Sequence, residues 1–395
     1  TIGSLLAGFS SLGFNFLIGA RVFQAVGASM TMSNSFGITT SNFPFSMRTR
    51  AMSVIGMFVS LGAIAGPAIG GAILNYLSWE YIFWVNVPVG LISIIIGAKY
   101  FPKDTIEQRG SKIDWIGSAI FFALIAVFFI ALNAAENLGF ANPWIIGGLI
   151  LSILLFYAFV RSQLVIKEPM IKLNIFKNQL YSVSLTTALL VFATNAYTNI
   201  LMPFYLQDLR GLTPGQAGLI LMAFPITNFF ISPVSGWLGD KFDKELITLI
   251  GLVGLTLVQV GFLSINAASP FSLLVIILIG NGLFTAIFQS PNNALTMSTV
   301  PKPLLGIAGS VTALARNIGF IIGNTLATIM LFIFMSNIAG HHIESYPSHQ
   351  PELFVESMHI SFFFAGLMSL IALFLTIYRM ASRKRLSRYI ENEVH

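Results

Sequence analysis

Uninterrupted apolar runs of about 20 residues recur along the chain and limit what it can fold into, because a helix of that length crosses the roughly 30 Å hydrocarbon layer of a membrane. Of the 395 residues, 55% are hydrophobic and only 9% are charged, an excess that a soluble core cannot absorb. Strands of a membrane barrel would instead alternate with period two over about 10 residues. The sequence therefore predicts an all-α polytopic membrane protein.

Breaks at glycine, proline and charged residues divide the apolar runs into predicted membrane spans. There are twelve, at residues 2–19, 22–43, 52–77, 80–101, 115–133, 143–161, 181–206, 215–238, 246–267, 271–293, 306–336 and 358–378. An even number of spans places both ends of the chain on the same side of the membrane.

The basic residues predict the orientation, because lysine and arginine concentrate in cytoplasmic loops. If the C-terminus is cytoplasmic, that side holds 18 of the 21 basic residues, and the opposite side holds only Arg210. We therefore expect a multi-pass protein with a cytoplasmic C-terminus. The 18 residues are Arg48, Arg50, Lys99, Lys103, Arg109, Lys112, Arg161, Lys167, Lys172, Lys177, Lys241, Lys244, Lys302, Arg379, Arg383, Lys384, Arg385 and Arg388.

The two remaining arginines, Arg21 and Arg316, fall at or inside predicted spans. A charge there is costly and by default indicates function. Alternatively, Arg21 is an interface residue whose side chain reaches the outer surface. Arg316 lies well inside its span, and its alternative role is a structural partner for helix carbonyl groups.

The most distinctive local pattern is GAIAGPAIGG at residues 62–71. Glycines spaced four residues apart form a flat stripe that lets another helix approach closely, and a proline inside a helix removes one backbone donor and bends or stiffens it. The stripe indicates either a tightly packed helix pair or a hinge between moving halves. The residues of the pattern that carry this prediction are Gly62, Gly66, Pro67, Gly70 and Gly71.

A weak internal repeat supports two parallel halves. A shift of 257 residues places the third predicted span on the eleventh, so that Gly62 and Gly66 align with Gly319 and Gly323. Parallel halves of this kind are a transporter architecture.

Several motifs, in order along the whole chain, resemble the major facilitator superfamily and in particular its 14-helix drug:proton antiporters. Residues 62–71 match that family's antiporter motif, and residues 17–29 resemble its fourth-helix motif, with Ala25 where glycine is usual. The other matching segments are Trp79–Gly90, Asp114–Gly117, Pro169–Phe176, Tyr205–Gln207 with Gly218, and Pro291–Gly319.

The resemblance implies the major facilitator fold, with about 12 of an expected 14 helices present and residue 1 inside the third family helix. The implied domains are residues 1–101, the remainder of the N-terminal bundle; 102–180, two linker helices; 181–380, a C-terminal six-helix bundle; and 381–395, a basic cytoplasmic tail. The chain is then an N-terminally truncated fragment, which we expect not to transport by itself.

A degenerate copy of the family's cytoplasmic loop motif occurs at Gly236–Lys244, with Gly236, Asp240 and Lys241 at matching positions. Asp243 replaces the usual glycine, so a tight turn there is in doubt. We expect Asp240 to cap the next helix at its positive end.

Site roles follow from the same resemblance. Arg21, Gln24 and Arg316 are expected in proton relay and gating. Polar residues within spans are expected to line a substrate cavity, although an intramembrane amide more often holds helices together. The cavity candidates are Asn34, Asn195, Asn199, Gln289 and Asn292.

Acidic residues are absent from the middle of every predicted span. All 15 lie in loops or near helix ends, whereas proton coupling needs a carboxylate that titrates in the cavity. In the family such an aspartate lies in the first helix. We therefore expect the coupling carboxylate outside this chain.

Other chemistries lack their residues. The chain has no cysteine, no phosphate-binding loop for ATP and no zinc spacing among His341, His342, His349 and His359. The resulting hypothesis is a monomeric, proton-driven exporter of hydrophobic or cationic drugs, without a cofactor, metal or nucleic-acid partner. The alternatives are a narrow-substrate exporter of an antibiotic, metabolite or lipid, and a membrane-embedded enzyme or sensor.

Overall fold

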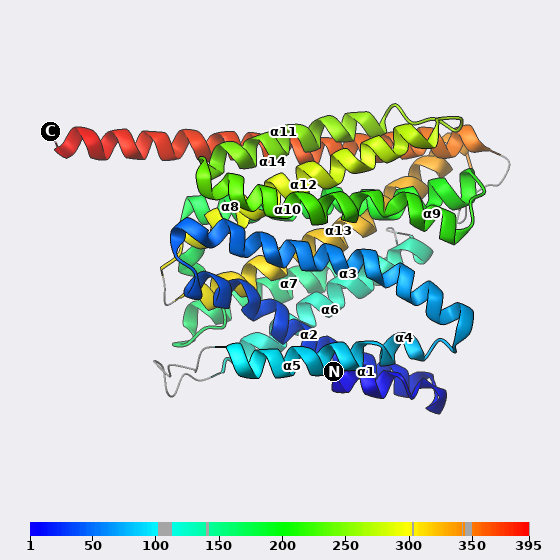
Figure 1. Ribbon diagram of the computed structural model, residues 1–395, viewed down its shortest axis with the longest axis horizontal. Coiled ribbons are helices and arrows are strands. Elements are labelled where there is room, and N and C mark those ends of the chain that lie inside the picture. The colour runs from blue at the N-terminus through cyan, green and yellow to red at the C-terminus, as the bar shows by residue number, and fades with distance from the viewer. Residues whose placement is uncertain (102–112, 140–141, 302–303, 342, 344–349, 395) are drawn as a thin grey trace.

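The computed structural model describes residues 1–101, 113–139, 142–301, 304–341, 343 and 350–394, without the side chains of residues 67, 68, 75, 136, 137 and 383–394. The predicted loop residues Lys103, Arg109, Lys112 and Lys302 therefore lie outside the described residues, as do His342 and His349. Figure 1 shows long helices lying side by side along one direction. The described residues contain helices and no strand, which confirms the all-α prediction.

The helices fall into three consecutive groups along the chain. The first comprises α1 (Ile2–Ala7), α2 (Phe14–Asn42), α3 (Arg48–Tyr76), α4 (Tyr81–Trp84) and α5 (Asn86–Tyr100). The second is the pair α6 (Trp115–Leu138) and α7 (Pro143–Val165). The third comprises α8 (Gln179–Phe204), α9 (Pro214–Leu221), α10 (Ala223–Lys241), α11 (Lys244–Phe262), α12 (Phe271–Ser298), α13 (Leu305–Ala339) and α14 (Pro351–Val394).

Among the described residues, 10 segments are long and apolar enough to cross a membrane, compared with the twelve predicted. The predicted span 2–19 is broken by a turn that contains a short 3-10 helix (Ser10–Leu12) and ends at Gly13, whose φ is 128°. The predicted boundary at residues 19–22 is wrong, because α2 continues through it. The second half of α2 is rich in serine and threonine, whose hydroxyls donate to carbonyl groups three or four residues earlier.

Helices α6 and α7 pack against each other and are connected by a buried hydrogen-bond network around Asp114 and Gln163. The Asp114 carboxylate caps α6 by accepting from Gly117 N at 2.7 Å, and it also accepts from Gln163 Nε2 of α7 at 2.7 Å and from Met170 N at 3.3 Å. The Gln163 Oε1 atom accepts from Ile171 N at 2.9 Å. One carboxylate and one amide therefore fix both helices and the segment that leads to α8.

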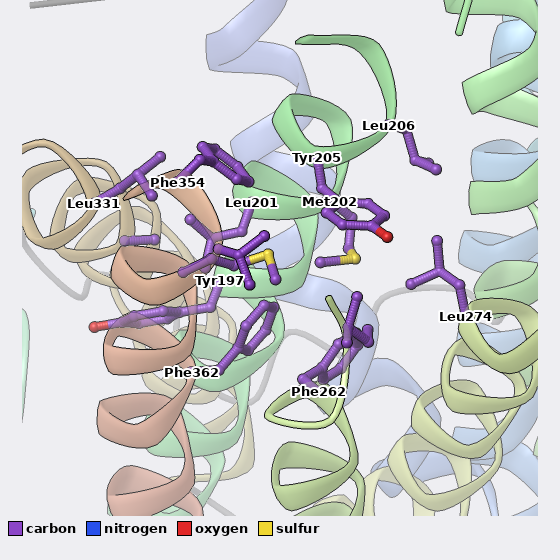
Figure 2. Close-up of a cluster of buried hydrophobic side chains, with 14 of the residues drawn as sticks. Tyr197, Leu201, Met202, Tyr205, Leu206, Phe262, Leu274, Leu331, Phe354 and Phe362 are labelled. Carbon is purple, nitrogen blue, oxygen red and sulfur yellow. The ribbon is translucent and has the colours of Figure 1, made fainter. Parts of the chain in front are cut away.

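Helix α8 is the central element of the third group. Its closest partner is α13, where Gly319 and Gly323 face α8 so closely that an added Cβ would lie 2.3 Å from the Leu189 and Ala193 carbonyl oxygens. The glycines of α13 that belong to the predicted repeat thus form a tightly packed contact between α13 and α8. Figure 2 shows the apolar core near the other end of α8, where Phe262 and Phe362 stack with ring centroids 4.3 Å apart.

Helix α3 packs along α10 and joins the first group to the third (Figure 1). Two glycines of α10 allow this approach: a Cβ on Gly236 would lie 2.9 Å from Arg50 Cα, and one on Gly239 would lie 2.5 Å from Thr49 Cγ2. We call this end of the molecule, which carries Arg48, Arg50, Lys241 and Lys244, the basic end.

Removing the Gln163 amide should destabilise the linker pair. In Gln163→Leu, Asp114 loses a donor and the Ile171 N–H is left buried without its acceptor, which costs about 1–3 kcal/mol for each unsatisfied group. Thermal unfolding of the detergent-solubilised protein, followed by circular dichroism, measures the loss. The matched control is Ser152→Ala on the same helix, because among the described residues the Ser152 hydroxyl bonds to Gly148 O within α7 and to no other helix.

The hydrogen-bond network around Asp114 predicts that the stability of the protein depends on pH. Burial raises the pKa of Asp114, but hydrogen bonds from Gln163, Gly117 and Met170 outweigh it and place the pKa below the ordinary value of 3.8. Asp114 therefore stabilises the fold above its ordinary pKa, and this contribution is lost as the pH falls through the lowered pKa. Between pH 7 and 3, the free energy of unfolding should fall less for Asp114→Asn than for the wild type. An equal fall in both proteins would contradict this assignment.

Candidate functional site

One cavity, of about 490 Å³, lies at the basic end, and the candidate site is a second cavity, of about 320 Å³, between α3 and the third group of helices. Five helices contribute to it: α3, α8, α10, α12 and α13. It is lined by Gly56, Val59, Ser60, Ala63, Phe192, Asn195, Asn199, Phe224, Pro225, Asn228, Thr285, Gln289, Arg316, Asn317 and Phe320. Helix α3 of the first group and four helices of the third group enclose it together, as expected for a solute site between two moving parts.

This central cavity continues away from the basic end. A neighbouring cavity of about 260 Å³ shares Ala63, Asn199, Phe224 and Pro225 with it. It is also lined by Gly218 and Leu221 of α9, Thr198 of α8, and Leu278 and Asn281 of α12. In the opposite direction, α3 and α10 are in close contact at Gly236 and Gly239. The arrangement is therefore closed at the basic end.

Arg316 provides the charge of the central cavity. Its guanidinium lies over the Phe192 ring, 5.3 Å from the ring centroid. No acidic side chain of the described residues lines this cavity. The cavity thus combines one cation, aromatic rings and amides.

The amides of the cavity differ in how far they are already hydrogen-bonded. Asn228 makes three of the four hydrogen bonds open to its amide: its Oδ1 accepts from Ser60 at 2.8 Å and from Ser232 at 3.2 Å, and its Nδ2 donates to Gly282 O at 3.4 Å. Asn195 accepts from Thr285 through Oδ1. Within the described part of the chain, no hydrogen bond holds the Gln289 side chain, so it is available to a solute.

Four of the sequence candidates, Asn195, Asn199, Gln289 and Arg316, line the central cavity together. Asn34 does not, because it is exposed on α2 and its amide donates to Met30 O within the same helix.

Asn292 lies elsewhere as well, toward the basic end, fully buried and bonded to an arginine. Its Oδ1 accepts from Arg379 at 2.9 Å, and its Nδ2 donates to Ser184 O at 3.2 Å. Arg379 was expected among the basic residues of the cytoplasmic side, but it is only 2% exposed and also donates to Ser184 Oγ at 2.7 Å. It contributes to the cavity of about 490 Å³ at the basic end, together with Lys244 and residues of α8 and α12.

Arg21 and Gln24 are adjacent to each other but do not line the central cavity. Arg21 is exposed on α2, donates to Gln24 Oε1 at 2.6 Å and lies over the Phe83 ring at 5.6 Å. Gln24 donates to Ser4 Oγ of α1 at 2.7 Å. This chain of contacts links α1, α2 and α4.

The glycine stripe of α3 has no close neighbour among the described residues. An added Cβ at Gly62, Gly66, Gly70 or Gly71 would meet no atom within 4 Å. The Pro67 side chain lies outside the described residues. The stripe is thus an open surface here, in contrast to the packed glycines of α13.

Asp240 caps a different helix from the one expected. Its carboxylate accepts from the backbone N–H groups of Thr49 at 3.1 Å and Arg50 at 3.2 Å, at the start of α3, and pairs with Arg50 Nε at 3.6 Å. The next helix, α11, is capped by Asp243, which accepts from Glu245 N at 3.0 Å. Asp240 lies too early in the chain to cap α11, but the close α3–α10 contact brings it to the positive end of α3.

The doubt about Asp243 is also resolved. Its φ of −61° is accessible to any residue, so the turn does not need glycine. Lys241 stays exposed beside Trp237, with its ammonium 4.7 Å from the ring centroid, and Lys244 lies 4.7 Å from the Phe45 ring centroid. The basic end is therefore closed by contacts from α10 and α11 to the loop and helix start at residues 45–50.

Sequence reasoning missed Asn228, Ser60 and Arg379. Asn228 and Ser60 form a hydrogen bond between the first and third groups of helices, but isolated polar residues in two distant spans give no sign that they meet. Arg379 could have been flagged by the apolar run that continues around it. Among the described residues, no group of three or more histidine or acidic side chains could hold a metal ion.

Comparison with known proteins identifies the fold family. The protein-family model described as "Major Facilitator Superfamily" matches residues 1–324 and 183–391 of this chain. Riboflavin transporter RibZ of Clostridioides difficile is 30% identical over 380 residues, covering 96% of this chain and 80% of that protein. Lincomycin resistance protein LmrB of Bacillus subtilis is 31% identical over 261 residues, covering 65% of this chain and 54% of that protein.

A solved structure also resembles this chain in outline. It is a bacterial homologue of the iron transporter ferroportin, in an outward-facing state with soaked iron. The alignment has a TM-score of 0.41 and 14% identity, and it covers 96% of this chain and 94% of the other.

The contact of Asp240 with α3 should control the opening of the basic end. Asp240→Asn removes the ion pair and the charge that favours the α3 N-terminus, which together are worth about 0.5–2 kcal/mol, so the open population should rise several-fold. Because the chain has no cysteine, spin labels at Ser41→Cys and Leu246→Cys report the distance across the basic end.

The matched control is Asp243→Asn. Asparagine caps a helix about as well as aspartate, and Asp243 caps only its own helix, so the label distances should stay at the wild-type distribution. An unchanged distribution in Asp240→Asn would show that its carboxylate does not hold the basic end closed.

Proposed function

Because this chain belongs to the major facilitator superfamily and is thus a secondary transporter of small molecules, not an enzyme, we propose that it exports hydrophobic or cationic drugs in exchange for protons. We assign it to the 14-helix drug:proton antiporters. The observation that carries this proposal is the central cavity, which α3 and the third group of helices enclose together. Its aromatic and amide lining suits loose binding of amphipathic molecules.

We place the basic end in the cytoplasm of a bacterial cell, with the chain crossing the cytoplasmic membrane many times. Support comes from the concentration of lysine and arginine at that end and from bacterial relatives. The conformation closed at the basic end is then the one that releases solute outward. We further propose that residues 1–101 and 181–380 move as two bundles, joined by the linker segment 102–180.

Opening the basic end requires α3 to separate from α10. The polar contacts that must break are the Asp240 cap, the Arg50–Asp240 ion pair and the Ser60–Asn228 hydrogen bond. Apolar contacts must separate as well, because Phe36 of α2 and Met52 of α3 are buried in one cluster with Met297 of α12 and Leu305 of α13. The open glycine stripe of α3 is the surface on which another helix can approach as the bundles move.

For proton coupling we propose that Arg21, Gln24 and Arg316 act with a carboxylate that the described residues do not supply. A guanidinium stays protonated, so it does not carry the proton but lowers the pKa of a nearby acid. Arg316 in the central cavity and Arg21 on α2 are placed on different helix groups, so each would act in a different part of the cycle.

A second candidate function is export of one narrow class of metabolite. The observation that favours it is the match of 96% of this chain to a riboflavin transporter at 30% identity. Riboflavin itself is the first compound to test, alongside lincomycin, because a relative is named for resistance to it.

Efflux from cells tests the proposed function. Cells that express the full-length protein should accumulate less ethidium, riboflavin or lincomycin than cells with the empty vector. A proton uncoupler should abolish that difference, because the proton gradient is the proposed energy source. Efflux that survives the uncoupler would rule out proton exchange, and selective efflux of riboflavin would favour the narrow-substrate function.

A further inference from the structure

The cavity of about 260 Å³ that adjoins the central cavity has a polar lining of its own. It shares Asn199 and Phe224 with the central cavity and lies on the side away from the basic end; we call it the far cavity. Because the central cavity is closed toward the basic end, the far cavity lies on the path that an exported solute takes. A solute in the central cavity therefore reaches it with any substituent that points outward.

One side chain of the far cavity is buried with part of its amide unused. Asn281 of α12 lines this cavity and is 0% exposed. Its Nδ2 donates to Thr198 Oγ1 of α8 at 3.3 Å, and among the described residues no group donates to its Oδ1. A buried carbonyl oxygen without a donor is costly in free energy. A solute group that donates to this oxygen is therefore favoured.

The neighbours of Asn281 fix its position. The adjacent Gly282 lets α12 approach α10 so closely that an added Cβ would lie 2.4 Å from Phe224 O, and Asn228 of α10 donates to Gly282 O at 3.4 Å. On the other side, the bond to Thr198 ties Asn281 to α8. The far cavity is thus the side from which a donor reaches Oδ1, and any other segment of the protein reaches it only by filling the same cavity.

Two further polar groups of the far cavity match a hydroxyl group. Asn199 donates through Nδ2 to Asn195 O at 3.1 Å, which leaves its Oδ1 as an acceptor. Thr198 Oγ1 accepts from Asn281, and a hydroxyl can donate at the same time. A solute hydroxyl also donates and accepts, whereas an ammonium group only donates. The remaining walls are mostly apolar: Leu221, Met222, Phe224, Pro225 and Leu278.

We propose that the far cavity is a second solute subsite, in which Asn281 accepts a hydrogen bond from a hydroxyl group of an otherwise apolar solute. Asn281 is then a specificity-determining residue, which favours hydroxylated compounds over their non-hydroxylated analogues. The proposal rests on the proposed function, since it places the apolar part of the solute in the central cavity. It adds a neutral determinant and leaves proton coupling to the central cavity and the expected carboxylate.

Two neutral flavins with the same ring system test the proposal: riboflavin, which carries a hydroxylated chain, and lumiflavin, which carries a methyl group in its place. Binding of each to the purified full-length protein is measured by equilibrium dialysis, with flavin fluorescence as the readout. Wild type should bind riboflavin at least about tenfold more tightly, a factor that corresponds to about 1.4 kcal/mol. Asn281→Leu should bind riboflavin about tenfold more weakly than wild type does and should bind lumiflavin with wild-type affinity.

Two further variants separate specificity from folding. Thr256→Val removes another hydrogen bond between helices of the third group, from Thr256 of α11 to Ser369 of α14 at 3.0 Å. Neither residue lines the central or the far cavity, so both affinities should stay at the wild-type values. Asn199→Leu removes the second acceptor and should reduce the preference for riboflavin even if Asn281→Leu does not fold. A variant that is merely misfolded would lose both flavins together.

Three results would overturn the proposal: equal affinities of wild type for the two flavins, equal weakening of both in Asn281→Leu, or binding of neither. Equal affinities in wild type would mean that the hydroxylated chain does not contact the far cavity or that another part of the protein fills it. Uncoupler-sensitive extrusion of ethidium by cells tests the proposed function separately. If extrusion is present, only the subsite is wrong; if extrusion is also absent, the proposed function fails with it.

Discussion

The contact between the carboxylate of Asp240 and the start of α3 holds together the arrangement on which the site depends. It satisfies two backbone N–H groups of α3 and brings Arg50 beside a carboxylate that is only 4% exposed. Gly236 and Gly239 make this possible, because side chains there would collide with α3. With α3 held against α10 at the basic end, the two helices enclose a cavity farther along their length. Closure and solute binding thus share the same pair of helices.

The hydrogen bonds that connect helices around the central cavity join neutral groups. Asn228 connects Ser60 of α3 to α10 and to the Gly282 carbonyl of α12, and Thr285 donates to Asn195. Neutral hydrogen bonds of this kind are worth little net free energy each, because alternative partners are available. They can therefore exchange as helices move. A buried ion pair at the same depth would cost more to break, since removing one partner leaves an uncompensated charge.

The success of sequence reasoning varied with the range of the interaction. The apolar segments from residue 81 onward agree with the structure to within a few residues in most cases, because length and hydropathy are local properties. The turn before Gly13 was missed although residues 8–13 hold two serines between two glycines, a composition that favours a turn. Of the cavity candidates, Asn195, Asn199, Gln289 and Arg316 lie together, whereas Asn34 and Asn292 do not. Composition treats all these polar residues alike, and only their faces and neighbours separate them.

The sequence by itself determined the solvent, the helical class and the family of this protein. Those properties follow from runs of apolar residues and from motifs, which are written in consecutive positions. Only the tertiary structure decided which helix Asp240 caps, that Arg379 is buried against Asn292, and that Arg316 lines the central cavity. Each of these depends on groups 80 or more positions apart in the chain, and the close approach of helix backbones at glycines decides which of them meet.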